Sequence, residues 1–428
     1  MKTLFLNSPI GGRGANYLKI TFAVLKRRKF FTFISLFGIS FTLTILVVAT
    51  AFLDHLIAPG YPEVNRDRSL YIWGLKEKDT KNGGMSSGPV SFSFINTYVR
   101  TLKTPAKVAA TSMPNSINIY LNNHKLKVNY RYTDANFWDI TSFEFLEGKP
   151  YTQQNIANND FVVVINDLVR DEYVGKGQSA VGKMMELDNV NYRIIGVVKG
   201  CPITRIQVAS DLYFPYNTSK SDLKDPRLRG SFGAIILPDN PDDFSKIQAE
   251  FSVVASKINP SKTGDKWFNP DKLYVFADRY VTSFTRQLRG DGENSGEAVV
   301  FSILFGIIFL FMSLPAINLI NINISRIMER ASEIGVRKAF GASSKTLVIQ
   351  FVIENIILTL IGGVLAIFMS LGIIYYLNHS DLIAYIDLSF NWKVFLGAIA
   401  VSLIFGLLSG VYPAWRMSKL QVVEALKG

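Results

Sequence analysis

The sequence predicts a membrane protein with four transmembrane α-helices and a large α+β domain, which lies outside the cytoplasm between the first and second spans. Three observations predict this class. The 428-residue chain contains four long apolar stretches that are almost free of charge. The long segment between the first two alternates strand-like and helix-like patterns. Lysine and arginine gather on the segments that face one side of the membrane, which gives the orientation.

The four expected spans are residues 30–53, 298–325, 346–377 and 394–415. The first, second and fourth carry no charged residue, and the third carries only Glu354. At about 1.5 Å of rise per residue, each exceeds the roughly 20 residues needed to cross the hydrocarbon core.

The first stretch also has one feature of a cleaved signal peptide. Ala49-Thr50-Ala51 resembles a cleavage site, but 29 residues precede the apolar run and the run is longer than a signal peptide requires. We therefore expect a retained membrane anchor.

Basic residues orient the spans. Residues 1–29 carry seven Lys and Arg and no acid, residues 326–354 carry five against three acids, and the tail 416–428 carries three against one. The loop 378–393 holds one Lys and two Asp. Positively charged flanks stay in the cytoplasm, so we expect both termini there. Residues 54–297 and the short loop 378–393 are then extracytoplasmic.

Charge and cysteine content argue against a nucleic-acid-binding protein and against a domain held together by internal disulfides. The net charge is +12, yet residues 54–297 hold 30 basic and 28 acidic residues, so the excess belongs to membrane-flanking segments. No basic face interleaved with aromatics marks a nucleic-acid-binding domain. Cys201 is the only cysteine and forms no internal disulfide, so the outer domain depends on its own packed core.

The outer segment has recognisable local signals of an α+β domain, either as one body or as two lobes. Ser116–Tyr120 and Lys125–Tyr132 predict a β-hairpin. Phe161–Ile165 predicts a buried strand followed by a helix that Asn166 caps. Met185–Val198 predicts two strands about a tight turn. Two further strands (Ala234–Leu237, Leu273–Ala277) and two loops (Lys76–Pro89, Arg289–Glu297) complete the expectation.

Two short motifs suggest catalysis but lie in the wrong context. Residues 177–184, GQSAVGKM, match a P-loop up to Met184, which lacks the hydroxyl that would bind Mg²⁺. A working P-loop follows a strand and opens a helix, whereas this stretch follows a helical pattern and precedes a strand. We therefore expect a turn that Gly182 relaxes. Gly84–Gly88 matches the G-x-S-x-G nucleophile elbow, which needs a strand before it and a helix after it, but we expect it to lie in a polar loop.

The loop after the second span predicts a short amphipathic helix on the cytoplasmic side. In residues 326–345, apolar positions recur at steps of three and four, and most charges lie on the other face. Glu333 and Arg337 form a favourable i, i+4 pair. Gly341 is a candidate C-cap. Such a helix rests on lipid headgroups or docks a cytoplasmic partner, and periodicity leaves both open.

The segment EIGVRKAFGAS, residues 333–343, resembles the cytoplasmic signature of the FtsX/MacB superfamily of ABC-transporter permeases. Residues 16–40, a basic amphipathic segment that leads into the first span, resemble the start of that family. Residues 133–155 and 179–198 resemble its extracytoplasmic core domain. YPAWRMSKLQVVEALKG, residues 412–428, resembles its C-terminal end. The resemblance covers nearly the whole chain in the right order.

The resemblance implies a non-catalytic permease subunit with four spans in the bacterial inner membrane. A second permease copy or a related permease completes a dimer, and a separate ATPase subunit carries ATP and Mg²⁺, so no cofactor is expected in this chain. A periplasmic adaptor is a possible further partner. The family's ATPase-coupling helix corresponds here to Arg326, Glu329, Arg330, Glu333, Ile334, Gly335, Arg337, Lys338, Ala339 and Gly341.

The spans contain further candidate residues. Small residues at four-residue spacing predict helix-packing seams, within one subunit or across a dimer: Gly362, Ala366 and Ser370 in the third span, and Ala398, Ser402, Gly406 and Gly410 in the fourth. Pro315 predicts a kink in the second span, with Asn318 and Asn321 beside it. Glu354 is an intramembrane carboxylate for which we favour a structural role over proton transfer.

Two other functions fit parts of the sequence. A membrane-anchored receptor or sensor would explain the outer domain, but the cytoplasmic segments are too short for an output domain. A membrane-bound hydrolase is disfavoured because His55, His124 and His379 are the only histidines and none has a partner near it in sequence.

Overall fold

The structure is a computed structural model. It describes residues 23, 26–27, 29–104, 106–121, 124–262, 268–290, 292–310, 313, 344–380 and 382–418. The chain divides into two compact units. One, the helical unit, comprises residues 1–53, 302–380 and 388–428. The other, the core domain, comprises residues 54–301 together with 381–387.

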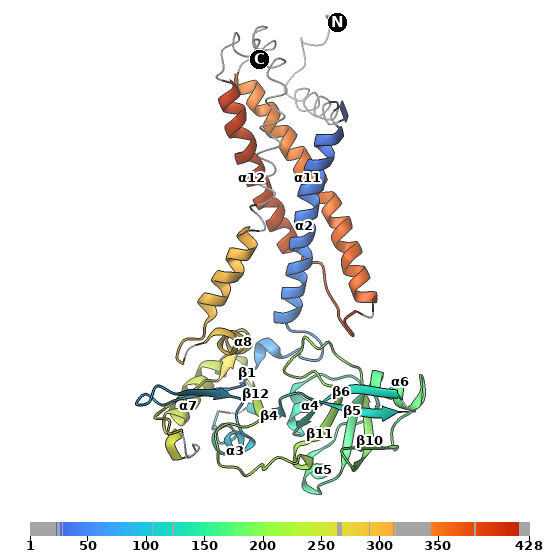
Figure 1. The fold of residues 1–428 in the computed structure, drawn as a ribbon, viewed down its shortest axis with the longest axis vertical. Coiled ribbons are helices and arrows are strands. Elements are labelled where there is room, and N and C mark those ends of the chain that lie inside the picture. The colour runs from blue at the N-terminus through green and yellow to red at the C-terminus, as the bar shows by residue number, and fades with distance from the viewer. Residues whose placement is uncertain are drawn as a thin grey trace, which may run out of the picture. The chain divides into compact units, whose positions relative to one another are not determined.

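The core domain is built on one large, mostly antiparallel sheet (Figure 1). The strand order is β14-β1-β12-β4-β6-β11-β8-β10-β7, with β5 paired to β6 and β9 to β10. The β10–β8 and β11–β6 pairs are parallel. The strands are β1 (Leu70–Ile72), β4 (Ala106–Ser112), β5 (Asn115–Leu121), β6 (His124–Thr133), β7 (Phe145–Gly148), β8 (Val162–Asn166), β9 (Met184–Leu187), β10 (Val190–Val198), β11 (Leu212–Pro215), β12 (Phe232–Pro238) and β14 (Asp278–Arg279).

A second sheet of three strands corrects one expectation. Lys76–Pro89 was expected to be a loop, yet it contains most of a hairpin of β2 (Leu75–Lys78) and β3 (Met85–Gly88), and β13 (Lys272–Val275) pairs with β2. The polar composition concealed the strands because inward-facing Glu77 is buried in an ion pair with Arg229, at 2.7 Å, instead of being apolar. The third strand also comes from far along the chain.

Other local predictions are confirmed. β5 and β6 form the predicted hairpin in register over seven residue pairs. The Asn166 side chain accepts a hydrogen bond from the Val169 amide at 2.8 Å and caps the helix that follows β8. β9 and β10 meet at Asp188 and Asn189, whose φ angles of 49° and 62° give the left-handed turn that Asx residues tolerate.

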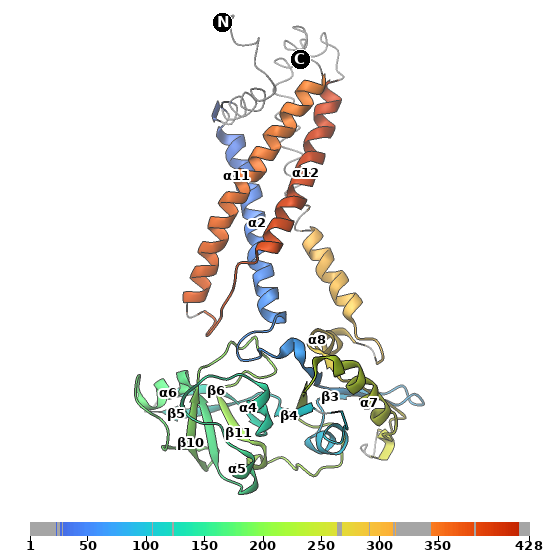
Figure 2. The same ribbon diagram turned by 180° about the vertical axis from the view of Figure 1, so that it is seen from behind.

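Helices and helical turns cover the sheet, with α7 and α8 toward one end and α6 toward the other (Figures 1 and 2). The aromatic rings of Phe137, Trp138 and Tyr213 pack together in one of its buried clusters. The helices are α3 (Phe92–Phe94), α4 (Asn136–Ile140), α5 (Gln153–Ala157), α6 (Asp167–Val174), α7 (Phe244–Ser256) and α8 (Tyr280–Arg289), with turns η1 (Arg66–Arg68), η2 (Ile95–Val99), η3 (Tyr216–Thr218), η4 (Pro241–Asp243) and η5 (Pro260–Lys262).

The stretch that imitates a P-loop is a turn, as predicted. It runs from the end of α6 to the start of β9, and Gly177 and Gly182 have φ angles of 76° and 88°. Side chains at those angles would be strained, which explains both glycines without a phosphate ligand.

The helical unit contains α2 (Lys29–Ile57, up to Leu53), α11 (Ser344–His379) and α12 (Trp392–Ser418), which lie side by side (Figure 2). A further helix, Glu297–Leu310, begins in the core domain and enters this unit. Among the described residues, Lys29–Ile57 and Val352–His379 are long and apolar enough to cross a membrane. The count of four spans stays a prediction.

Candidate functional site

The sequence-predicted coupling helix is residues 326–345, and all of it except residues 344 and 345, the start of α11, lies outside the described residues, as do Pro315, Asn318 and Asn321. We therefore take as the candidate site the region of the core domain around the end of α2. We call it the junction: His55, Arg66, Asp167, Gly200, Thr204, Arg205, Tyr385 and Asp387, all within the core domain.

Two buried arginines hold the end of α2. A helix leaves its last carbonyl groups without intrahelical partners, and cationic side chains satisfy them favourably. Arg66 donates to the carbonyl of Leu56 at 2.6 Å, and Arg205 donates to the carbonyl of Ala58 at 2.8 Å. Both arginines are at most 4% exposed. The last residues of α2, which belong to the core domain, are therefore held in a water-poor environment.

The charge of Arg66 is compensated locally. Its guanidinium forms an ion pair with buried Glu63 and lies 4.0 Å from the centroid of the Tyr280 ring. Removing one partner of such a buried pair leaves an uncompensated charge and costs about 3–5 kcal/mol. The end of α2 is thus tied to η1 and α8 by interactions that are expensive to break.

His55, in the last turn of α2, joins two other segments. Its Nδ1 lies 3.1 Å from the carbonyl oxygen of Asp387, and its Nε2 lies 3.0 Å from the hydroxyl of Thr204. A carbonyl only accepts, so this geometry assigns the proton to Nδ1 and leaves Nε2 to accept from Thr204. One ring therefore bridges α2, the 382–387 loop and the loop that follows β10.

Tyr385 fixes the 382–387 loop more firmly. Its hydroxyl donates to the carboxylate of Asp167, the first residue of α6, which also accepts from the Gly200 amide at 2.9 Å. Its ring lies against Gly200, where an added Cβ would approach the ring Cζ to 2.2 Å. Tyr385 itself has a φ of 60°, an unusual angle for a bulky residue. This loop connects α11 to α12 in sequence, so its attachment bears on both helices.

Arg131 shapes the loop that carries Thr204 and Arg205. It is fully buried on β6 and donates to the carbonyls of Ile206, Gln207 and Ala209 at 2.6–3.0 Å. Burial lowers the pKa of Arg131 to about 10, so it stays charged at neutral pH. Carbonyl groups replace its hydration, and the loop is held in one conformation.

The predicted packing residues of the third and fourth spans are placed as follows. Cβ atoms built at Gly362 and Gly363 would lie 2.7 Å from Ile39 of α2 and 2.9 Å from Ile399 of α12. The absence of side chains there lets three helices of one chain approach closely. Ala366, Ala398 and Ser370 are buried and Ser402 is half-buried; Gly406 and Gly410 lie in α12, where side-chain surroundings fall outside the description.

Sequence reasoning missed the junction. Arg66, Arg131 and Arg205 are isolated cations with no periodic pattern, and the contacts of Tyr385 join residues far apart in the chain. The sequence did single out Cys201, which adjoins Gly200. Although the residue is only partly buried, desolvation raises the pKa of its thiol to about 12. Glu354 is buried within α11.

Two family models match the chain. Residues 32–253 match the MacB-like periplasmic core domain, and residues 305–422 match the FtsX-like permease C-terminal region.

Similar proteins carry related descriptions. An ABC transporter permease of Bacillus subtilis (strain 168), YvrN, is 25% identical over 299 residues, which cover 69% of this chain and 68% of that protein. A macrolide export ATP-binding/permease protein, MacB, of Hahella chejuensis (strain KCTC 2396) is 23% identical over 429 residues. That alignment covers 97% of this chain but only 60% of the relative. The solved extracellular domain of the ABC-type transporter YknZ matches 48% of this chain at 15% identity and a TM-score of 0.36.

Proposed function

Since this chain belongs to the FtsX/MacB superfamily of ABC-transporter permeases, we propose that it transmits the ATP-driven motion of an ATPase subunit to its core domain. The core domain then performs export or other work outside the cytoplasm. In this proposal, ATP and Mg²⁺ bind to a separate ATPase chain. Two permease copies, identical or related, form the membrane part, and a periplasmic adaptor is an optional further partner.

The junction is the observation that carries the proposal. A transmission device needs stiff elements that move together with the part they drive. α2 continues without a break from Lys29 to Ile57, and Arg66 and Arg205 hold its last carbonyls. Tyr385 and Asp387 attach the α11–α12 loop to the same region. In this proposal, these contacts pass a displacement of the helices on to the core domain.

The input side of the mechanism is the expected cytoplasmic helix, residues 326–345. We expect Glu333 and Arg337 to face a groove on the ATPase. Replacing either one, or placing proline at Ala339, should uncouple ATP hydrolysis from the permease while the chain remains in the membrane. Unchanged ATPase binding by all three variants would exclude this docking role. The isolated chain should not hydrolyse ATP.

The test of transmission separates it from ATPase binding. The full chain is purified with its co-purifying ATPase, Cys201 is replaced by serine, and a nitroxide is attached at exposed Lys224→Cys. Electron paramagnetic resonance then measures the distance between the labels of two copies with and without ATP and vanadate. We expect vanadate trapping to shift this distance distribution in the reference protein.

The decisive variant is Tyr385→Phe, which removes only the hydroxyl bonded to Asp167. We expect normal ATP hydrolysis but a reduced or absent distance shift. Tyr173→Phe is the matched control, because the Tyr173 hydroxyl also makes one bond, to the Met184 carbonyl, away from the junction. An equal shift in all three proteins would refute transmission through the junction. If no ATPase co-purified with the chain, the whole proposal would fail.

A further inference from the structure

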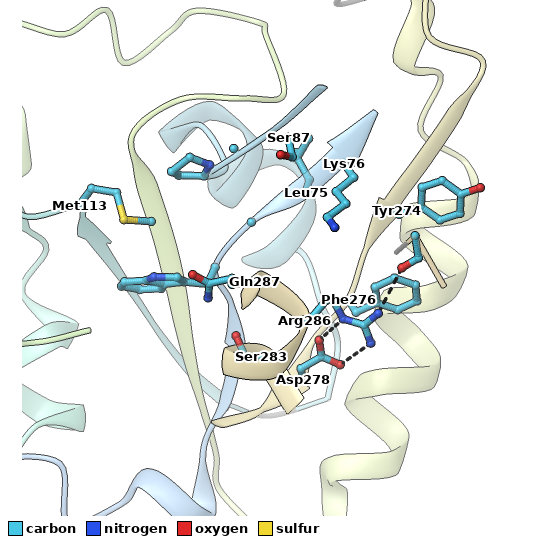
Figure 3. A pocket seen from close by; sticks show the side chains of 15 residues that line it. Leu75, Lys76, Ser87, Met113, Tyr274, Phe276, Asp278, Ser283, Arg286 and Gln287 are labelled. Carbon is cyan, nitrogen blue, oxygen red and sulfur yellow. Dashed lines mark hydrogen bonds and ion pairs between the residues drawn. The ribbon is translucent and has the colours of Figure 1, made fainter. Parts of the chain in front are cut away.

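A pocket of about 220 Å³ lies in the core domain away from the junction. Its walls come from the β2–β3 hairpin, the segment from β13 to β14, and α8 (Figure 3). Part of its lining is aromatic and aliphatic, with Trp73, Leu75, Met113, Tyr274 and Phe276. Among the described contacts, those that hold the end of α2 and the 382–387 loop involve none of the residues that line the pocket.

The aromatic wall is set rigidly. Trp73 is only 4% exposed, and its ring lies directly on β12 at Gly233, where an added Cβ would approach ring atom Cε3 to 2.2 Å. Phe276 is covered on one face by the guanidinium of Arg286, 4.0 Å from the ring centroid. Fixed aromatic faces of this kind favour a flat apolar group in the pocket.

Two polar side chains of the pocket make no hydrogen bond among the described residues. Ser283 of α8 is 4% exposed, and within the described part of the chain its hydroxyl makes no hydrogen bond; the same holds for the indole N–H of Trp73. In Figure 3, Ser283 and Gln287 extend from α8 on the side of the pocket. Both groups are donors that the described protein leaves unused at the wall of the pocket, so both are suited to bind an acceptor atom of a ligand.

The charge of the pocket is positive. Arg286 and Asp278 neutralise each other through two contacts of 2.6 and 3.2 Å, and Arg286 also donates to the carbonyls of Gly292 and Glu293. Lys76 has no acidic partner among the lining residues, and within the described part of the chain it donates only to the carbonyl of Gly290. Its ammonium has three protons, so two remain for a ligand.

We propose that this pocket binds a small molecule in which one carboxylate stands beside an aromatic or apolar group. The carboxylate pairs with Lys76 and accepts from Ser283 and Trp73, and the apolar group stacks in the aromatic wall. This goes beyond the proposed function, because it gives the core domain a ligand of its own. It does not depend on an ATPase.

The test uses the full chain in lipid nanodiscs and three probes: 3-phenylpropanoate, its neutral analogue 3-phenylpropanamide, and inorganic phosphate. Saturation-transfer NMR and calorimetric titration measure the affinities. We expect 3-phenylpropanoate to bind with a millimolar or lower dissociation constant, at least about ten-fold tighter than the amide. Inorganic phosphate should not displace it at equal concentration.

Three variants locate the binding. Lys76→Met should weaken 3-phenylpropanoate by about ten-fold or more while changing the amide by less than about two-fold. Lys78→Met is the matched control, since Lys78 is on the same strand but exposed and outside the pocket, and it should change neither. Ser283→Ala, which preserves packing, should weaken both probes.

The proposal is overturned by any of three results: no saturable binding of 3-phenylpropanoate at about 10 mM, equal effects of Lys76→Met and Lys78→Met, or displacement by phosphate alone. Displacement by phosphate would indicate a general anion site to which the aromatic wall contributes nothing. Thermal unfolding of each variant confirms that it is folded. Because ATP hydrolysis is not measured, the result stands apart from the test of transmission.

Discussion

Gly200→Ala adds one methyl group at the point where the Tyr385 ring packs on Gly200 and holds the 382–387 loop. A Cβ at this position would lie 2.2 Å from Cζ, 2.3 Å from Cε2 and 2.5 Å from the hydroxyl oxygen of Tyr385. All three distances are below any real carbon contact, so the ring must leave or the backbone must shift. The three atoms nearest to this methyl group all belong to Tyr385, which is part of the core domain.

The expected cost follows from the two ways in which the protein can respond. Forcing the methyl in with the ring in place costs about 1–3 kcal/mol, as other overpacked sites do. Releasing the ring instead forfeits the hydrogen bond to the Asp167 carboxylate, about 1.5–3 kcal/mol. The protein takes the cheaper route, so we expect Gly200→Ala to lower the free energy of unfolding by about 2 kcal/mol.

A double-mutant cycle isolates this contact. The free energy of unfolding is measured by urea titration of the full chain in detergent, followed by tryptophan fluorescence, for Gly200→Ala, Tyr385→Ala and the double variant. Without the ring, the three closest contacts of the methyl are gone, so Gly200→Ala should cost less than about 0.5 kcal/mol in the Tyr385→Ala background. An equal cost in both backgrounds would show that Tyr385 does not lie on Gly200.

Three other predictions concern sites elsewhere. Gly362→Ala should lower the thermal stability of the detergent-solubilised chain by an overpacking cost of about 1–3 kcal/mol, whereas Gly372→Ala in the same helix, where a Cβ meets nothing within 4 Å, should leave it unchanged or higher. Maleimide should label Cys201 about a thousand-fold more slowly at pH 7 than an ordinary thiol, because the raised pKa of Cys201 keeps its thiolate scarce. The labelling rate should rise about ten-fold per pH unit up to about pH 12. A labelling rate that levels off near pH 9 would contradict the raised pKa. Gly233→Ala should displace Trp73 and shift its fluorescence emission, and an unchanged spectrum would count against the close ring contact.

The sequence by itself determined the features that arise from neighbouring residues. Apolar runs of sufficient length predicted the helices α2, α11 and α12. Period-two patterns that flank Asx turns predicted the β5–β6 and β9–β10 hairpins. Asn166 was identified as a cap because capping needs only residues three positions apart. The same local reasoning failed for β2 and β3, whose buried Glu77 is neutralised by the distant Arg229.

Only the tertiary structure decided the junction and the pocket. Tyr385 and Asp167 are separated by 218 positions, and His55 and Asp387 by 332. Trp73 and Ser283 likewise reach one pocket from opposite ends of the core domain sequence. Helical and strand periodicity describes which face of an element is apolar, but it does not state which distant element will cover that face. The packing of the folded chain determines those partners. It brings single arginines and a tyrosine together in the junction, and a serine into the pocket.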